Sequence, residues 1–212
     1  WLCDRKPEPA KAMHWLRETQ SYLSSYSFTA NLGASFLSGF GFCFLFGGTL
    51  IDAIVAGFCG ILIGLADRFM TKLNTNQFFK TITEAFIMSV PAYALGSFGL
   101  INNADASIIG TLMLLVPGLL FVNAMRDIIF GDTNSGVNRI VQVLLIAVAI
   151  ALGTGSAWSL VNEFITIEIT PAVLHAPWLQ CLSAIVACIG FAIVFNVHGR
   201  GFILCVLGGG VA

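Results

Sequence analysis

The sequence has few charged residues. Asp, Glu, Lys and Arg together make up 10% of the 212 residues, whereas a soluble domain has roughly a quarter. Hydrophobic residues make up 57%, and the formal net charge is −1. So little charge argues against an ordinary soluble domain, and the near-neutral balance argues against a nucleic-acid-binding protein. The composition therefore predicts a membrane protein.

Cysteine pairs with the spacing of metal or redox motifs are absent. None of the six cysteines forms a C-x-x-C pair, and all but Cys3 lie in apolar runs. We interpret them as small packing residues and expect no metal and no cofactor. Residues 1–27 also lack the apolar core of a cleavable signal peptide.

Enzyme motifs are absent as well. Phe130-Gly131-Asp132 lacks the first glycine of the G-x-G-D pattern of intramembrane aspartyl proteases, and residues 133–136 do not form the G-x-S-G of serine rhomboids. The sequence contains no H-E-x-x-H and no phosphate-binding loop. We therefore expect no enzymatic activity.

Long apolar runs are what the sequence has instead. About 20 apolar residues cross a bilayer core of roughly 30 Å. The run 53–66 gives only about 21 Å of charge-free helix, so Asp52 or Asp67 must lie at membrane depth or the helix is short. We predict an all-α, multi-pass bundle with a seventh span starting near Gly201. The six complete spans are expected near 28–48, 50–70, 80–100, 106–130, 138–161 and 177–197.

The charges sort to the two sides of this predicted bundle. All ten Lys and Arg residues fall in segments on one side. The other side has no Lys or Arg and carries Asp52, Asp105, Glu163, Glu168 and His175. The positive-inside rule makes the basic side cytoplasmic, so we expect a cytoplasmic N-terminus and a location in the inner or plasma membrane.

We expect three segments. Residues 1–27, with an amphipathic stretch over 10–23, predict a cytoplasmic linker that ends in a helix on the membrane surface. Residues 28–161 hold five spans, and residues 162–212 hold a loop and the start of a second membrane half. Because the sequence opens on Trp1 and stops within an apolar run, we expect a fragment of a longer protein.

Pro117 and Gly118 interrupt the predicted span 106–130. Proline removes a backbone hydrogen bond and glycine loosens the turn. In lipid, such a break persists only where protein or a water-filled cavity covers it. Transporters place substrate sites at breaks of this kind, where a half-helix N-terminus could receive a carboxylate. A kink that serves packing alone is the alternative.

Polar residues follow the break. Asn123, Arg126 and Asp127 have the spacing of one helix face, so Arg126 could hold a substrate carboxylate or pair with Asp127 or Asp132. Ser135 could belong to a binding loop or cap the next helix. A surface ion pair and a tight turn are the structural alternatives.

Two carboxylates are predicted at membrane depth, where ionisable residues are costly and often functional. Asp52 lies at the outer end of the second span, and Glu84 lies about one turn inside the third. Either could take up and release a proton during a transport cycle. The alternatives are a helix cap for Asp52 and, for Glu84, a side chain that reaches the interface beside Lys80.

Two stretches resemble one known family. The pattern P-G-x(7)-R-D-x(3)-G-D-x(2)-S-G-x(2)-R over residues 117–139 resembles the signature of the threonine/serine exporter family of bacteria and fungi. The stretch G-F-C-F-L-F-G-G-T-L-I-D-A over residues 41–53 is similar to the same family. The resemblance implies two five-helix halves, a soluble region before Trp1 and threonine and serine efflux driven by the proton gradient.

A short repeat agrees with two halves. Residues 41–46 and 190–195 both fit G-F-x-Φ-Φ-F, where Φ is apolar. With five spans in each half, the second half would begin outside and run inverted. Chance similarity of two apolar runs is the alternative.

We therefore expect a secondary transporter that exports small polar metabolites. Relatives of the family that are split into two chains are linked to dicarboxylate export, so succinate is the alternative substrate. A passive channel or a non-transporting membrane scaffold is the alternative of another class. The expected partners are the substrate, protons and the lipid bilayer, with a homo-oligomer left open and no nucleic acid.

Overall fold

The computed structural model describes residues 13–14, 26–164 and 175–211, which form helices and connecting turns without a strand. The all-α fold is therefore confirmed. Most of the predicted linker 1–27, with its amphipathic stretch, lies outside the described residues. The helices are α3 (Phe28–Leu45), α4 (Leu50–Lys72), α5 (Gln77–Ser97), α6 (Ala104–Leu112), α7 (Gly118–Ile129), α8 (Thr133–Phe164), α9 (Pro177–Val194) and α10 (Arg200–Val211).

Four of the described helices are long and apolar enough to cross a membrane, namely α3, α4, α8 and α9. We expected six such spans and the start of a seventh. The count differs because α5 carries Lys80, Glu84 and several hydroxyl residues, and because the predicted span 106–130 consists of the two short helices α6 and α7. Helices lie where the spans were predicted, but fewer of them meet the criteria of length and composition.

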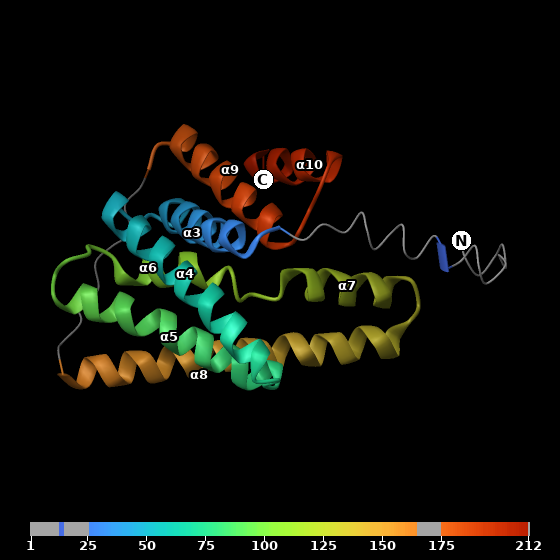
Figure 1. Ribbon diagram of the computed structural model, residues 1–212, viewed down its shortest axis with the longest axis horizontal. Helices are drawn as coiled ribbons and strands as arrows, with labels where there is room; N and C mark the ends of the chain where they lie inside the picture. The colour runs from blue at the N-terminus through green and yellow to red at the C-terminus, as the bar shows by residue number, and fades with distance from the viewer. Residues whose placement is uncertain (1–12, 15–25, 165–174, 212) are drawn as a thin grey trace.

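The helices form a bundle with a projecting hairpin (Figure 1). α3 packs against α4, α6 and α9, while α5 packs against α4 and α8. α7 packs along the first part of α8, and this pair extends beyond the ends of α4 and α5 (Figure 1). With 32 residues, α8 is about 48 Å long, which exceeds the thickness of a bilayer core.

The two ends of the bundle differ in charge. α4 ends and α5 begins at what we call the basic end, where Lys80 pairs with Asp67 and donates a hydrogen bond to Thr71 Oγ1 at 3.1 Å. The first turns of α4 and α6 lie at the opposite, acidic end and contain Asp52 and Asp105. The basic residues of α4 and α5 are Arg68, Lys72 and Lys80.

Small and hydroxyl residues bring α3, α4 and α6 close together. A β-carbon at Gly39 of α3 would lie 2.6 Å from the carbonyl oxygen of Ala56 in α4. The hydroxyl of Thr111 in α6 donates to that same oxygen at 3.1 Å, and the hydroxyl of Ser107 donates to the carbonyl oxygen of Asp52 at 2.9 Å. Close approach through small residues and hydroxyl bonds is typical of helix packing in membranes.

The helices that carry the short repeat have the same structure. α3 and α9 each contain 18 residues. After α3, the N–H of Gly48 donates to the carbonyl oxygen of Cys43 at 2.9 Å; after α9, the N–H of Val197 donates to Ala192 at 2.8 Å. In both turns the residue before the donor has a positive φ, 84° after α3 and 56° after α9, as in a common helix C-cap.

α3 and α9 run antiparallel. The backbone N–H of Tyr26, just before α3, donates to Asn196 Oδ1, just after α9, at 3.2 Å. At the other end of the pair, the rings of Phe44 and His175 stack with centroids 4.2 Å apart. The beginning of each helix therefore lies beside the end of the other.

Equivalent glycines form the contact between these helices. A β-carbon at Gly41 of α3 would lie 2.8 Å from the carbonyl oxygen of Ser183 in α9. A β-carbon at Gly190 of α9 would lie 2.6 Å from the carbonyl oxygen of Ala34 in α3. Gly41 corresponds to Gly190 and Ala34 to Ser183 in the two segments. The contact of Gly41 with α9 is therefore equivalent to the contact of Gly190 with α3.

Candidate functional site

The predicted interruption of span 106–130 is present in the structure. α6 ends at Leu112 and α7 begins at Gly118, with a turn between them. Pro117 is the N-cap residue of α7, and no side chain in the described part of the chain caps this helix. The N–H of Gly118 donates to the carbonyl oxygen of Val116 at 2.8 Å. The first turn of α7 therefore offers N–H groups to the space beside the break.

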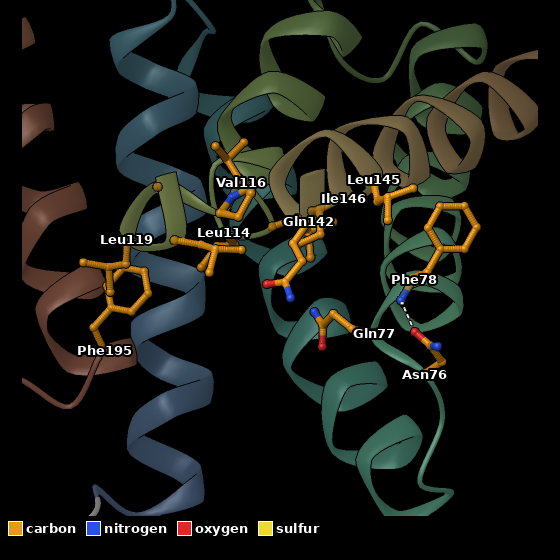
Figure 2. Close-up of a pocket in the computed structure, with 14 residues that line it drawn as sticks. Asn76, Gln77, Phe78, Leu114, Val116, Leu119, Gln142, Leu145, Ile146 and Phe195 are labelled. Carbon is orange, nitrogen blue, oxygen red and sulfur yellow. Dashed lines mark hydrogen bonds between the residues drawn. The ribbon is translucent and has the colours of Figure 1, made fainter. Parts of the chain in front are cut away.

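A cavity of about 610 Å³ occupies that space, and we call it the break cavity. Its walls come from the start of α5, residues 114–120, α8 and Phe195. Figure 2 shows Gln77 and Gln142 extending toward one another, and it shows the hydrogen bond from the Phe78 N–H to Asn76 Oδ1 at 3.0 Å. The lining is mostly apolar, with carboxamides as its polar groups.

A second cavity, of about 650 Å³, lies between α3, α4 and α5, and we call it the Glu84 cavity. It shares Gln77, Leu114 and Leu115 with the break cavity. Charged residues of the last turns of α4 line it at the basic end, and Glu84 of α5 lines it farther along. Both volumes fall within the roughly 300–1,000 Å³ of small-molecule sites.

Glu84 is buried, with 3% of its surface exposed. Its Oε1 atom has no hydrogen-bond partner in the described part of the chain. The expected alternative, a side chain reaching the interface beside Lys80, is wrong because Lys80 pairs with Asp67 of α4 while Glu84 faces the interior. Most buried polar atoms have partners, so an unpartnered carboxyl oxygen marks a candidate binding position.

Asn31 of α3 provides a second such atom. Its Oδ1 is buried without a partner among the described residues, and the side chain lines the same cavity as Glu84. Sequence reasoning missed Asn31. The available signal was a carboxamide in a predicted span that has no charged residue.

Asp52 has a different environment from Glu84. Its side chain is fully buried, and its two oxygens accept hydrogen bonds from the N–H groups of Thr49 and Asn102, both at 2.8 Å. Asp52 and Thr49 form a capping box at the start of α4. The structure therefore shows the helix cap that was the alternative for Asp52, while a role in proton coupling stays a prediction.

The other predicted substrate-binding residues lie in the projecting hairpin. Asn123, Arg126 and Asp127 belong to α7 and Ser135 to the first turn of α8. None of the four lines either cavity. Of the predicted set, only Pro117 and Gly118 line one of them.

Asp127 forms an ion pair, but its partner is not Arg126, the residue considered in the sequence analysis. Asp127 pairs with Arg139 of α8 across the hairpin at 3.0 Å, whereas the guanidinium of Arg126 lies over the ring of Phe130, 5.8 Å from its centroid. Ser135 does not cap α8, because its own N–H donates to Asp132 Oδ1 at 3.3 Å. Sequence spacing pointed to a partner within one helix, but the hairpin brings Arg139 closer.

Among the described residues, no three His, Cys, Asp or Glu side chains come together as a metal site. The polar groups of the two cavities are carboxamides, hydroxyls, charged side chains at the basic end and one buried carboxyl group. This set can bind a small polar molecule through hydrogen bonds and charge.

Comparisons with known proteins agree with the resemblance. The chain is 28% identical over 153 residues to a protein of Corynebacterium glutamicum described as "Threonine/serine exporter". The match covers 70% of this chain and 31% of that protein, so the chain spans about a third of the length of its relative. No solved structure matches the chain. The threonine/serine exporter family model matches residues 2–161, and the chain therefore belongs to the threonine/serine exporter family.

Proposed function

We propose that this chain forms part of a secondary transporter that exports threonine and serine across the inner or plasma membrane, driven by the proton gradient. The observation that carries the proposal is a cavity lined by basic residues at one end and by a buried, unpartnered carboxyl group farther along. Family membership and the name of the relative support the substrates. The same family points to a transporter rather than an enzyme.

The proposed orientation follows from charge. Basic residues gather where α4 ends and α5 begins, and the positive-inside rule makes this end cytoplasmic. The Glu84 cavity then faces the compartment from which an exporter takes its substrate. This orientation requires several helices to cross the membrane. One of them is α5, which packs against α4 and α8.

Glu84 is the proposed proton-coupling residue. Its unpartnered oxygen can bind a proton or a positively charged group in turn. Asp52 remains the alternative, but its oxygens are already occupied by two backbone N–H groups. The geometry favours Glu84 because a coupling residue must exchange its partner during the cycle.

The break supplies the second proposed element. Pro117 and Gly118 line the break cavity at the start of α7, where free N–H groups favour an anionic group such as a substrate carboxylate. Asn123, Arg126, Asp127 and Ser135 remain proposed contacts along the hairpin. Because the two cavities share Gln77 and adjoining residues of the break, a substrate could pass from one to the other.

The test uses the full-length protein in proteoliposomes with an imposed proton gradient and labelled threonine, serine and succinate in parallel. We expect gradient-dependent movement of threonine and serine above that in empty liposomes. Movement of succinate alone would replace the substrate by a dicarboxylate. Downhill flux of substrate that does not depend on the proton gradient would indicate a channel. The absence of any flux would indicate a scaffold.

A further inference from the structure

Two side chains that line the Glu84 cavity each carry an acceptor oxygen without a hydrogen-bond partner among the described residues. Oε1 of Glu84 belongs to α5 and Oδ1 of Asn31 belongs to α3. Both atoms are buried, and neither receives a hydrogen bond from the described residues. Both side chains line the same cavity. Such a pair calls for a ligand that donates hydrogen bonds in more than one direction.

A primary ammonium group has the matching chemistry. It carries three N–H donors and a positive charge, so its chemistry suits the Asn31 oxygen as well as the Glu84 carboxylate. A proton satisfies Glu84 but leaves the Asn31 oxygen without a donor. A carboxylate would place an acceptor against acceptors. We propose that Asn31 and Glu84 bind the ammonium group of the transported amino acid, an inference that rests on the proposed function and specifies how its substrate is held.

Positively charged side chains line the basic end of the same cavity. Arg68 and Lys72 of α4 line it there, and the Arg68 guanidinium lies over the ring of Phe28, 4.1 Å from its centroid. An amino acid would therefore enter with its ammonium group toward Glu84 and its carboxylate toward these cations. This arrangement selects a zwitterion and disfavours a dicarboxylate, whose second carboxylate would face Glu84.

Hydroxyl groups lie on the walls between α3 and α5. Ser35 donates to the Asn31 carbonyl oxygen at 3.0 Å and Thr81 donates to the Gln77 carbonyl oxygen at 2.9 Å. Both line the cavity, and both hydroxyl oxygens can still accept a hydrogen bond. They are suited to receive the side-chain hydroxyl that threonine and serine share.

Binding at Glu84 links the substrate to the proton. A carboxyl group that holds a proton cannot form an ion pair with an ammonium group, so the two ligands exclude each other. The charged groups that line the cavity beside Glu84 are Asp67, Arg68 and Lys72 of α4. On α5, Lys80 is paired with Asp67, while the cavity residues of the break and of α9 are apolar. At a pH at which Glu84 carries a proton before binding, threonine binding should therefore release that proton.

The experiment measures binding to the purified full-length protein in detergent by calorimetry. The ligands are threonine, threoninol, which keeps the ammonium group but lacks the carboxylate, and N-acetylthreonine, which keeps the carboxylate but lacks the ammonium group. We expect threonine and threoninol to bind and N-acetylthreonine to bind at least about tenfold more weakly. Titrations in buffers of different ionisation enthalpy should show proton release on threonine binding.

Variants locate the site. Glu84→Gln should lower the affinity for threonine and for threoninol by about tenfold or more and should abolish proton release. Asn31→Leu should lower the affinity for both ligands, while proton release remains. Asp105→Asn, which neutralises an exposed carboxylate at the acidic end, is the matched control and should bind like the wild type. If Glu84→Gln does not fold, the same binding measurements are made with Glu84→Asp, and proton release is tested in the wild type by the buffer titrations.

The outcomes separate this inference from the proposed function. N-acetylthreonine binding as tightly as threonine, or an unchanged threonine affinity in Glu84→Gln, would overturn the ammonium site even if threonine is transported. Glu84-dependent binding of threoninol without threonine flux would keep the site and overturn the exporter. A folded wild-type protein that binds none of the amines would overturn the ammonium site.

Discussion

The rings of Phe42 in α3 and Phe191 in α9 lie with their centroids 4.8 Å apart. These residues follow Gly41 and Gly190 in the two copies of the short repeat, so each contacts its own equivalent. Equivalent positions meet only where a two-fold axis passes between them. Because α3 and α9 are antiparallel, that axis is perpendicular to the helices, as in transporters with inverted repeats. The contact agrees with the predicted repeat, in which α9 would be the first helix of the second half.

The glycine contact predicts paired stability effects. Gly41→Ala and Gly190→Ala each place a methyl group within 2.8 Å of a backbone carbonyl oxygen, and we expect each to lower the free energy of unfolding by about 1–3 kcal/mol. Gly33→Ala is the control on the same helix, because a β-carbon there meets nothing within 4 Å. Thermal unfolding in detergent checks this, and equal melting temperatures for all three variants would contradict it.

The hairpin predicts a coupled pair between Asp127 and Arg139. Both side chains are partly exposed, so Asp127→Asn and Arg139→Gln should each cost about 0.5–1 kcal/mol, and the double variant should cost no more than one of them. The control pairs Asp127→Asn with Arg126→Gln, which should be additive. Chemical unfolding of the three single and two double variants measures the coupling. Additivity for the Arg139 pair would count against the contact.

The two buried carboxyl groups predict opposite phenotypes. Asp52→Asn places an NH₂ group against one of the two N–H donors and should lower the free energy of unfolding by about 2 kcal/mol, while the folded fraction keeps gradient-driven efflux. Glu84→Gln removes an unpartnered oxygen and should keep the melting temperature but lose the response to the gradient. Thermal unfolding and proteoliposome flux of both variants decide between them. Loss of coupling in folded Asp52→Asn would move the coupling role to Asp52.

The proposed orientation predicts which side each end of the bundle faces. In a variant without native cysteines, Gln77→Cys lines both cavities at the basic end and should react with a membrane-impermeant maleimide in inside-out vesicles. Leu50→Cys, at the start of α4 and 60% exposed, should react in intact cells. The reverse pattern of labelling would invert the orientation.

The sequence predicted the features that depend on local signals. The break at Pro117 appears where the proline and glycine placed it, and the repeat at Gly41 has the same geometry in both copies. Residues whose role depends on a distant partner were not predicted. Asn31 could have faced lipid or the interior, and only the packing of α3 against α4 decides that it lines a cavity together with residues of α5. For Asp127, the hairpin turn rather than helical spacing selects the partner.

The length of α8 has a mechanical consequence. Gly136 near its start packs against α7, where a β-carbon would lie 2.9 Å from the carbonyl oxygen of Ala124. Gly153 farther along packs against α5, where a β-carbon would lie 2.5 Å from the carbonyl oxygen of Ile82. One unbroken helix thus contacts both α7 in the projecting hairpin and the helical turn of α5 that contains Glu84. A displacement of α7 that moved α8 as a rigid helix would therefore also move the backbone beside that buried carboxyl group.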